Sequence, residues 1–287
     1  MKRILLCTDG SPFAQSSYPY GAWLAQRLGA SVDLLYVSDD RGQATAEATD
    51  LSGSIGLGAS ESLLKKLVEV EHERAKLNHQ RAKPILAAAG QTLTAGGAET
   101  VKLIHKTGFL VDYLENLEVD ADLIVLGKRG ESAQFASGHL GANLERILRA
   151  SHRPCLVTPR HYQPVERVLL AYDGSLSSQA MLAFVTQSPL LKGLDIHVIT
   201  VAKDANRAIA AASLKQAQHQ LQSAGWSPVC TLAEGAPETA IAQYCQTKAM
   251  SLLLMGAYGH SRIRHLVIGS TTAQVLRSTD LPVLVFR

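Results

Sequence analysis

The sequence predicts an α/β protein made of two tandem doubly wound domains, each built on a five-stranded parallel sheet. Apolar strand-like runs alternate with amphipathic segments, the whole order occurs twice, and Asp-Gly-Ser follows the first run of each copy. This alternation favours right-handed crossovers with helices on both faces of the sheet. The expected strand order is 3-2-1-4-5, which puts a ligand crevice between strands one and four.

Matching segments reveal the duplication and set the expected domain limits. The offset between matched segments falls from 164 to 129 along the chain, so the first copy carries a net 35 additional residues. We expect a first domain over 1–160 and a second over 165–287. The matched pairs are 2–11 with 166–175, 32–37 with 196–201, 121–127 with 250–256, and 154–157 with 282–285.

The elements between these segments follow from periodicity. A first helix follows each Asp-Gly-Ser, and in the first copy its apolar side chains recur at helical spacing, as they do in the third helix. The second helix is expected to end at Gly90 or Gly225, because glycine is a common C-terminal cap, and Pro84 to kink or shorten the first of these. The apolar positions are Ala14, Tyr18, Ala22, Ala25 and Leu28, then Leu110, Leu114 and Leu117.

Most of the additional residues of the first copy lie at about 39–62. Apolar residues show no periodicity there. A mobile loop is the simpler interpretation, and a lid over the ligand edge is the alternative, because the segment follows strand two.

Composition and charge exclude several function classes. The net charge of +3 and the aromatic content of 5% argue against nucleic-acid binding. No apolar run reaches the ~20 residues of a membrane span, and the N-terminal run is too short for a signal peptide, so a cytoplasmic protein is expected. The cysteines have no metal-ligand spacing, which predicts buried free thiols and no protein metal site. They are Cys7, Cys155, Cys230 and Cys245.

The clearest candidate site follows the fourth strand of the second copy. Gly256, Gly259 and Gly269 precede Ser270 and Thr271. Glycine lets backbone N–H groups approach an anion, and a helix N-terminus adds donors and partial positive charge. The stretch therefore predicts a phosphate cradle, in one crevice with the aspartate that ends strand one.

These features resemble the universal stress protein family in its tandem two-domain form, whose fold is adenine nucleotide alpha hydrolase-like. The resemblance rests on the Asp-Gly-Ser strand end and on G-x-x-G-x9-G-[S/T], and it covers essentially the whole chain. It implies a stress-response regulatory protein that binds ATP or ADP, with or without Mg²⁺, and has no catalytic residues. The implied nucleotide contacts are Ala171, Tyr172, Asp173, Val201, Met255, Gly256, Gly259, His260, Gly269, Ser270 and Thr271.

The first copy departs from this pattern. Ten residues, instead of nine, separate Gly130 from Gly141, and Ala142 replaces the hydroxyl residue, although Lys128 and Arg129 offer compensating charge. We expect a competent site in the second domain and a vestigial or differently specific one in the first. The residues of the first site are Thr8, Asp9, Val37, Gly127, Gly130, Gly141 and Asn143.

Two alternative functions stay open. A slow ATPase or phosphotransferase is disfavoured because no Walker lysine, GxSxG or HExxH pattern is present. A nucleotide-free interaction scaffold is disfavoured by the intact second motif. The resemblance also implies that the last strands, 155–157 and 283–285, pair within the chain as a pseudo-dimer, and it leaves association into a homodimer open.

Overall fold

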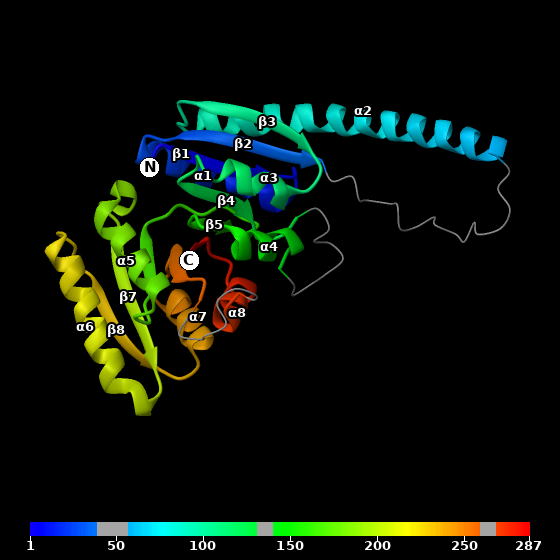
Figure 1. Ribbon diagram of the computed structural model, residues 1–287. Coiled ribbons are helices and arrows are strands. Elements are labelled where there is room, and N and C mark those ends of the chain that lie inside the picture. Colours follow the sequence, from blue (N-terminus) through cyan, green and yellow to red (C-terminus); the bar gives the residue numbers. More distant parts are fainter. Residues whose placement is uncertain (39–56, 131–139, 259–267) are drawn as a thin grey trace.

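A ten-stranded sheet covered by helices on both faces forms the centre of the molecule (Figure 1). The computed structural model describes residues 1–38, 57–130, 140–258 and 268–287. The strand order is β3-β2-β1-β4-β5-β10-β9-β6-β7-β8. Each half therefore has the order 3-2-1-4-5, and the predicted α/β fold class is confirmed. Over the described residues, no helix has both the length and the apolar character that crossing a bilayer requires.

The two halves contain corresponding elements. The first half has β1 (Arg3–Thr8), α1 (Pro12–Leu28), β2 (Ser31–Ser38), α2 (Leu57–Ala95), β3 (Val101–Thr107), α3 (Leu110–Leu117), β4 (Leu123–Gly127), α4 (Ala142–Ala150) and β5 (Cys155–Thr158). The second half has β6 (Arg167–Ala171), α5 (Leu176–Gln187), η2 (Pro189–Leu191), β7 (Asp195–Ala202), η3 (Asp204–Asn206), α6 (Arg207–Ser223), β8 (Val229–Glu234), α7 (Pro237–Thr247), β9 (Leu252–Gly256), α8 (Ser270–Ser278) and β10 (Val283–Phe286).

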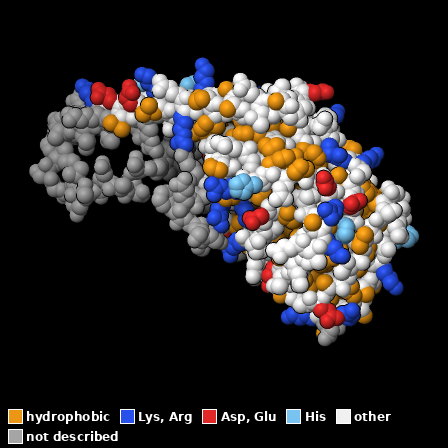
Figure 2. Space-filling model, turned by 180° about the vertical axis from the view of Figure 1, so that it is seen from behind, with side chains coloured by type: hydrophobic (Ala, Val, Ile, Leu, Met, Phe, Trp, Pro, Cys, Tyr) orange, Lys and Arg blue, Asp and Glu red, His pale blue; other side chains and the backbone are white. Residues whose placement is uncertain are grey.

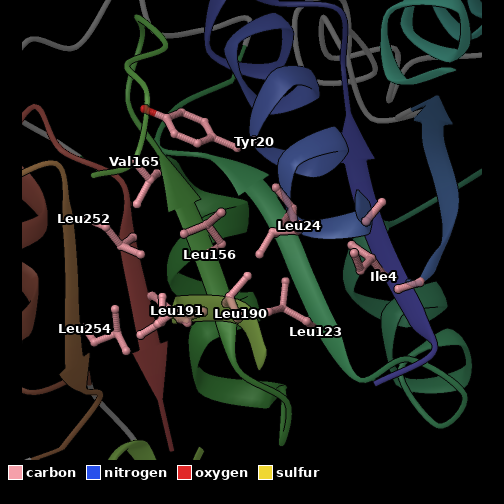
Figure 3. Packing of buried hydrophobic residues seen from close by; sticks show 14 of the residues in the cluster. Ile4, Tyr20, Leu24, Leu123, Leu156, Val165, Leu190, Leu191, Leu252 and Leu254 are labelled. Carbon is pink, nitrogen blue, oxygen red and sulfur yellow. The ribbon is translucent and has the colours of Figure 1, made fainter. Parts of the chain in front are cut away.

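The strands alternate their side chains between two apolar layers. Ile4 and Leu6 of β1 belong to one buried cluster, and Leu5 and Cys7 belong to the other. The first cluster continues from one half into the other, as Figure 3 shows around Leu156. Burial of each large aliphatic side chain contributes about 1.5–3 kcal/mol. The halves therefore share one core layer.

Helix α2 corrects the sequence prediction for this region. It continues through Pro84 and Gly90 to Ala95, so the predicted end at Gly90 is wrong and Pro84 does not end the helix. Leu86 and Leu93 are buried against the sheet, and this burial offsets the hydrogen bond that Pro84 removes. In the second half, α6 ends at Ser223, and the predicted cap Gly225 follows with φ 87°.

The first turns of α2 also change the predicted loop. Residues 57–62 are helical rather than irregular, and the amino-terminal part of α2 extends beyond the sheet (Figure 1). Residues 39–56 lie outside the described residues, so both the loop and the lid stay predictions.

Strands β5 and β10 connect the halves as antiparallel neighbours. Cys155 lies opposite Val285, and Val157 lies opposite Val283. All residues of both strands are buried. The sheet thus crosses the junction without a break.

Cationic side chains strengthen this junction by donating to backbone carbonyls of the opposite half. Lys128 Nζ donates to the Thr279 carbonyl at 2.6 Å, just beyond α8. Arg287 donates to the carbonyls of Arg149, Ala150 and Ser151 at the end of α4. Cations at helix C-termini satisfy orphan carbonyls and complement the helix dipole. Each half therefore caps the last helix of the other.

Candidate functional site

The two Asp-Gly-Ser segments build the same turn. Asp173 Oδ1 accepts a hydrogen bond from the Ser175 N–H at 2.9 Å, and Asp9 Oδ1 accepts one from Ser11 at 2.9 Å. Gly174 has φ 78°, a left-handed conformation that favours glycine. The serines then cap α5 and α1. The turn is thus a folding element in both halves, and it does not by itself distinguish a ligand site.

A cavity of about 290 Å³ lies at the carboxyl edge of the second half, between the ends of β6 and β9. The predicted contacts that line it are Ala171, Tyr172, Asp173, Val201, Met255, Gly256, Gly269, Ser270 and Thr271. The structure thus brings these residues together around one cavity. The other two predicted contacts, Gly259 and His260, lie outside the described residues.

Sequence reasoning missed five further lining residues. They are Ile199, Pro237, Ile241, Tyr258 and Thr272. Ile199 had a signal, because it precedes Val201 by two positions and so points to the same face of β7. Ile241, Tyr244 and Cys245 have the spacing of an apolar helix face in the sequence, but only the fold shows that α7 reaches the cavity.

The cavity has an apolar part and a polar end. Ile199, Ile241 and Met255 all belong to the buried cluster on this face of the sheet. Ser270 and Thr271 begin α8 at the other end. Among the described lining residues, Asp173 is the only one with a carboxylate, and none carries a cationic side chain. Among the described residues, the donors for an anionic ligand are backbone N–H groups and hydroxyls at the positive end of the helix dipole.

The N-terminus of α8 is built to leave its donors accessible. Its N-cap residue is Gly269, which makes no side-chain hydrogen bond to the helix. The first N–H groups of a helix have no partner within the helix. Thr272 Oγ1 donates to the Gly256 carbonyl at 2.9 Å, which holds the helix start against the end of β9. The cradle is therefore held in place by the chain itself.

Close packing also explains why glycine ends β9. Ser177 Oγ donates to the Tyr258 carbonyl at 2.7 Å and crosses directly over Gly256. A Cβ on Gly256 would lie 2.4 Å from that hydroxyl oxygen. The hydroxyl and a larger residue at 256 cannot share this space without a shift.

Tyr258 adds a buried polar atom to the cavity wall. Its side chain is 9% exposed, and its phenolic oxygen has no hydrogen-bond partner in the described part of the chain. The guanidinium of Arg287 lies 5.9 Å from the ring centroid. A buried hydroxyl without a partner costs about 1–3 kcal/mol.

The segments that form the corresponding crevice of the first half have different neighbours. Asp9 Oδ2 lies 2.8 Å from the position that a Cβ on Gly130 would occupy, so the carboxylate contacts the glycine loop directly. Gly141 lies beside Gly130. The Ile85 side chain of α2 covers Gly10, with Cδ1 2.8 Å from the corresponding Cβ position. At the end of β1, Asp9 thus contacts the glycine loop, and Ile85 covers the turn from the other apolar layer.

The remaining predicted residues of the first site have other roles or positions. Thr8 Oγ1 shares a 2.7 Å hydrogen bond with Tyr18 Oη. Gly127 packs against the Phe13 backbone. Val37 lies near the end of β2, and Asn143 is exposed in the first turn of α4.

Lys128 does not direct its charge into the first crevice. It is only 7% exposed, and its Nζ donates to the Thr279 carbonyl of the second half. Burial lowers the pKa of Lys128 to about 8, while the nearby Asp280 partly opposes this shift. The expectation that Lys128 compensates for the missing hydroxyl is therefore wrong, because its ammonium group joins the two halves.

Comparison with known proteins adds the evolutionary context. The model of the "Universal stress protein family" matches residues 1–159 and again 164–287. The chain belongs to the universal stress protein family. It is 58% identical over 287 residues to Universal stress protein Slr1230 of Synechocystis sp. strain PCC 6803, with 100% of both chains covered.

Solved structures agree with this universal stress protein in fold. A universal stress protein from Archaeoglobus fulgidus DSM 4304 superposes with a TM-score of 0.74 at 21% identity, covering 99% of this chain and 98% of that one. The protein PA1789 from Pseudomonas aeruginosa PAO1 gives a TM-score of 0.64 at 16% identity, covering 100% and 92%.

Proposed function

We propose that this universal stress protein is a stress-response regulatory protein that binds ATP or a related adenine nucleotide, chiefly in its second domain. One observation carries the proposal: a carboxylate, an apolar slot and the uncapped N-terminus of α8 line the same cavity. Each part suits one portion of such a ligand.

The base would occupy the apolar part of the cavity. Ile199, Ile241 and Met255 offer apolar surface to an aromatic ring. The Asp173 carboxylate is an acceptor, which matches the amino group of adenine and opposes the carbonyl oxygen of guanine. The backbone of Val201 completes the base contacts. The volume of about 290 Å³ is near the lower end for small-molecule sites.

The phosphates would lie at the start of α8. The backbone N–H groups of Ser270 and Thr271, together with the hydroxyls of the same two residues, supply the donors among the described lining residues. Mg²⁺ would enter with the phosphates, because the described lining offers it only one carboxylate.

The organisation of the chain is part of the same proposal. Domains over 1–160 and 165–287 would act as an intramolecular pseudo-dimer through β5 and β10, whose pairing supports this interpretation. The four cysteines are free thiols, which suits a reducing cytoplasm.

Calorimetric titration with ATP and Mg²⁺ tests the function through a pair of matched variants. Ser270→Asp puts a negative charge beside the phosphates but keeps a residue that favours the first turn of a helix. We expect a loss of ATP affinity of roughly 100-fold. Ala142→Asp makes the same change at the matching position of the first domain and should leave the affinity unchanged.

The nucleotide base provides a second arm of this experiment. GTP should bind at least about tenfold more weakly than ATP, because its carbonyl oxygen faces the Asp173 carboxylate. Absence of ATP binding at millimolar concentration, or equal losses in both aspartate variants, would contradict the proposal.

A further inference from the structure

Two histidines from separate elements meet on the first domain, away from the glycine loop. His79 of α2 and His105 of β3 are 26 residues apart in sequence, and their Nδ1 atoms lie 3.3 Å from each other. The ring centroids are 5.4 Å apart. On its other side, His105 Nε2 lies 2.8 Å from Ser38 Oγ at the end of β2.

The separation of the two nitrogens matches that of ligands on one tetrahedral metal ion. Zinc binds imidazole nitrogens at 2.0–2.1 Å, so two such ligands at a tetrahedral angle are about 3.3–3.4 Å apart. At the right angle of a square-planar site they would be roughly 2.8–3.0 Å apart. In the absence of metal the two nitrogens share a hydrogen bond at 3.3 Å, and this separation is already the one that two ligands of a tetrahedral ion require.

The environment of His105 also suits a metal ligand. Metal-binding histidines typically donate the N–H of their other ring nitrogen to a nearby acceptor, which fixes the tautomer. If Nε2–H donates to Ser38 Oγ, then Nδ1 presents its lone pair toward His79. Tyr36 packs beside the His105 ring with a centroid distance of 5.7 Å. One ligand is thus already oriented, while the other, His79, lies on the exposed surface of α2.

The second domain shows that the fold does not require this polar group. The register of β7 and β8 places Leu232 opposite Thr200, as β2 and β3 place His105 opposite Tyr36. Ala202 ends β7 where Ser38 ends β2. Leu232 and Ala202 therefore occupy the sheet positions that match His105 and Ser38. Packing of the sheet alone does not explain why the first domain has a histidine and a serine there.

We propose that His79 and His105 form a binding site for a divalent transition metal, with tetrahedral Zn²⁺ as the preferred ion. Both Nδ1 atoms would bind the metal, and the His79 proton would move to Nε2, which is exposed to water. Among the described residues no group of three or more His, Cys, Asp or Glu side chains has metal-binding geometry, so water molecules would complete the coordination. This proposal does not depend on nucleotide binding.

Calorimetric titration of the full chain with Zn²⁺ tests the site. We expect one ion per chain in the wild type. His105→Leu and Ser38→Ala copy residues that the second domain already tolerates, and His79→Ala changes an exposed side chain. Each histidine variant should lower the zinc affinity by about tenfold or more, and the serine variant by a smaller factor, since it removes only the orienting contact. His72→Ala, an exposed histidine on the same helix, should leave the affinity unchanged.

Cobalt(II) reports the geometry and the ligand type in the same proteins. The wild type should give the intense visible absorption of tetrahedral Co²⁺, and His79→Ala should abolish it while circular dichroism shows an intact fold. A weak six-coordinate spectrum, a thiolate charge-transfer band from the cysteines, or zinc affinity unaffected by both histidine variants would each overturn the proposal.

Discussion

The glycine loops of the two domains follow matching strands, β4 and β9, and have different surroundings. In the second domain the loop borders a cavity that contains Asp173 and the start of α8. In the first domain the Asp9 carboxylate lies against Gly130, and Lys128 extends to the second domain. The comparison teaches that one loop of the duplicated fold borders an open crevice, whereas the other joins the two halves.

The neighbours of the glycines beside the two crevices also differ. In the first domain the Ile85 side chain covers Gly10. In the second domain the matching glycine, Gly174, has a hydroxyl as its neighbour: Ser213 Oγ lies 3.3 Å from the position that a Cβ on Gly174 would occupy. Phe13 packs against the first loop, and Ser177 packs against the second. Serine hydroxyls in the second domain thus approach the glycines that Ile85 and the Phe13 backbone contact in the first. Ile85 packs in the apolar layer opposite the one that contains Ile199 and Met255, so these differences alter the packing of the turns and not the lining of the cavity.

The largest expected effect comes from alanine at the glycines that end β4 and β9. A Cβ on Gly127 would meet the Phe13 backbone at 2.9 Å, whereas a Cβ on Gly256 meets the rotatable Ser177 hydroxyl. Gly127→Ala should therefore lower the free energy of unfolding by about 2–3 kcal/mol, and Gly256→Ala by about 1 kcal/mol, the cost of one hydrogen bond. Urea unfolding measures both, and an equal or reversed order would refute the packing argument.

The next effect separates the two aspartates. Asp173→Ala should weaken ATP binding by about tenfold, because an acceptor for the base is lost. Asp9→Ala should not change it. Both variants remove the 2.9 Å turn hydrogen bond, so each should lower the thermal stability. Equal effects on nucleotide affinity would mean that both crevices contribute to ATP binding, and would contradict the difference between the two domains.

The smallest effect concerns Lys128 and depends on pH. Its pKa is about 8 in the folded protein and 10.5 as the ordinary value, so between these values the unfolded chain binds the additional proton. Stability that Lys128 contributes should therefore rise as the pH increases from 8 to 10. Lys128→Met should change stability by less than about 1 kcal/mol at pH 7, where the lost hydrogen bond and the relieved burial of charge oppose each other.

The pH dependence is measured as a difference between proteins. Two buried thiols also affect stability at these pH values, because burial raises the pKa of Cys7 and Cys155 from the ordinary value of 9.0 to about 12. The difference between the unfolding free energies of the wild type and Lys128→Met at each pH gives the contribution of Lys128 alone, because the other groups are the same in both proteins. A difference that stays constant from pH 7 to 10 would show that the ammonium group is not buried at the junction.

Sequence reasoning recovered what local patterns determine. Strand and helix periodicity and the repeated Asp-Gly-Ser predicted the α/β fold class, which the structure confirms. The same patterns failed where tertiary burial outweighs propensity: α2 passes Pro84 because its apolar face packs on the sheet. They also gave no sign that Ile85 covers Gly10 or that His79 meets His105, since these contacts join residues far apart in the chain.

The pairing of β5 with β10 has a consequence for how the two unlike domains stay together. Both strands are buried along their full length, and the free edges of the described sheet are β3 and β8 at its two ends. Separate subunits joined this way would dissociate on dilution and would exchange to give pairs of like domains. Within a single chain, the partner strand is always present at a high effective concentration. One copy of each domain is therefore kept in every pair, however scarce the protein becomes.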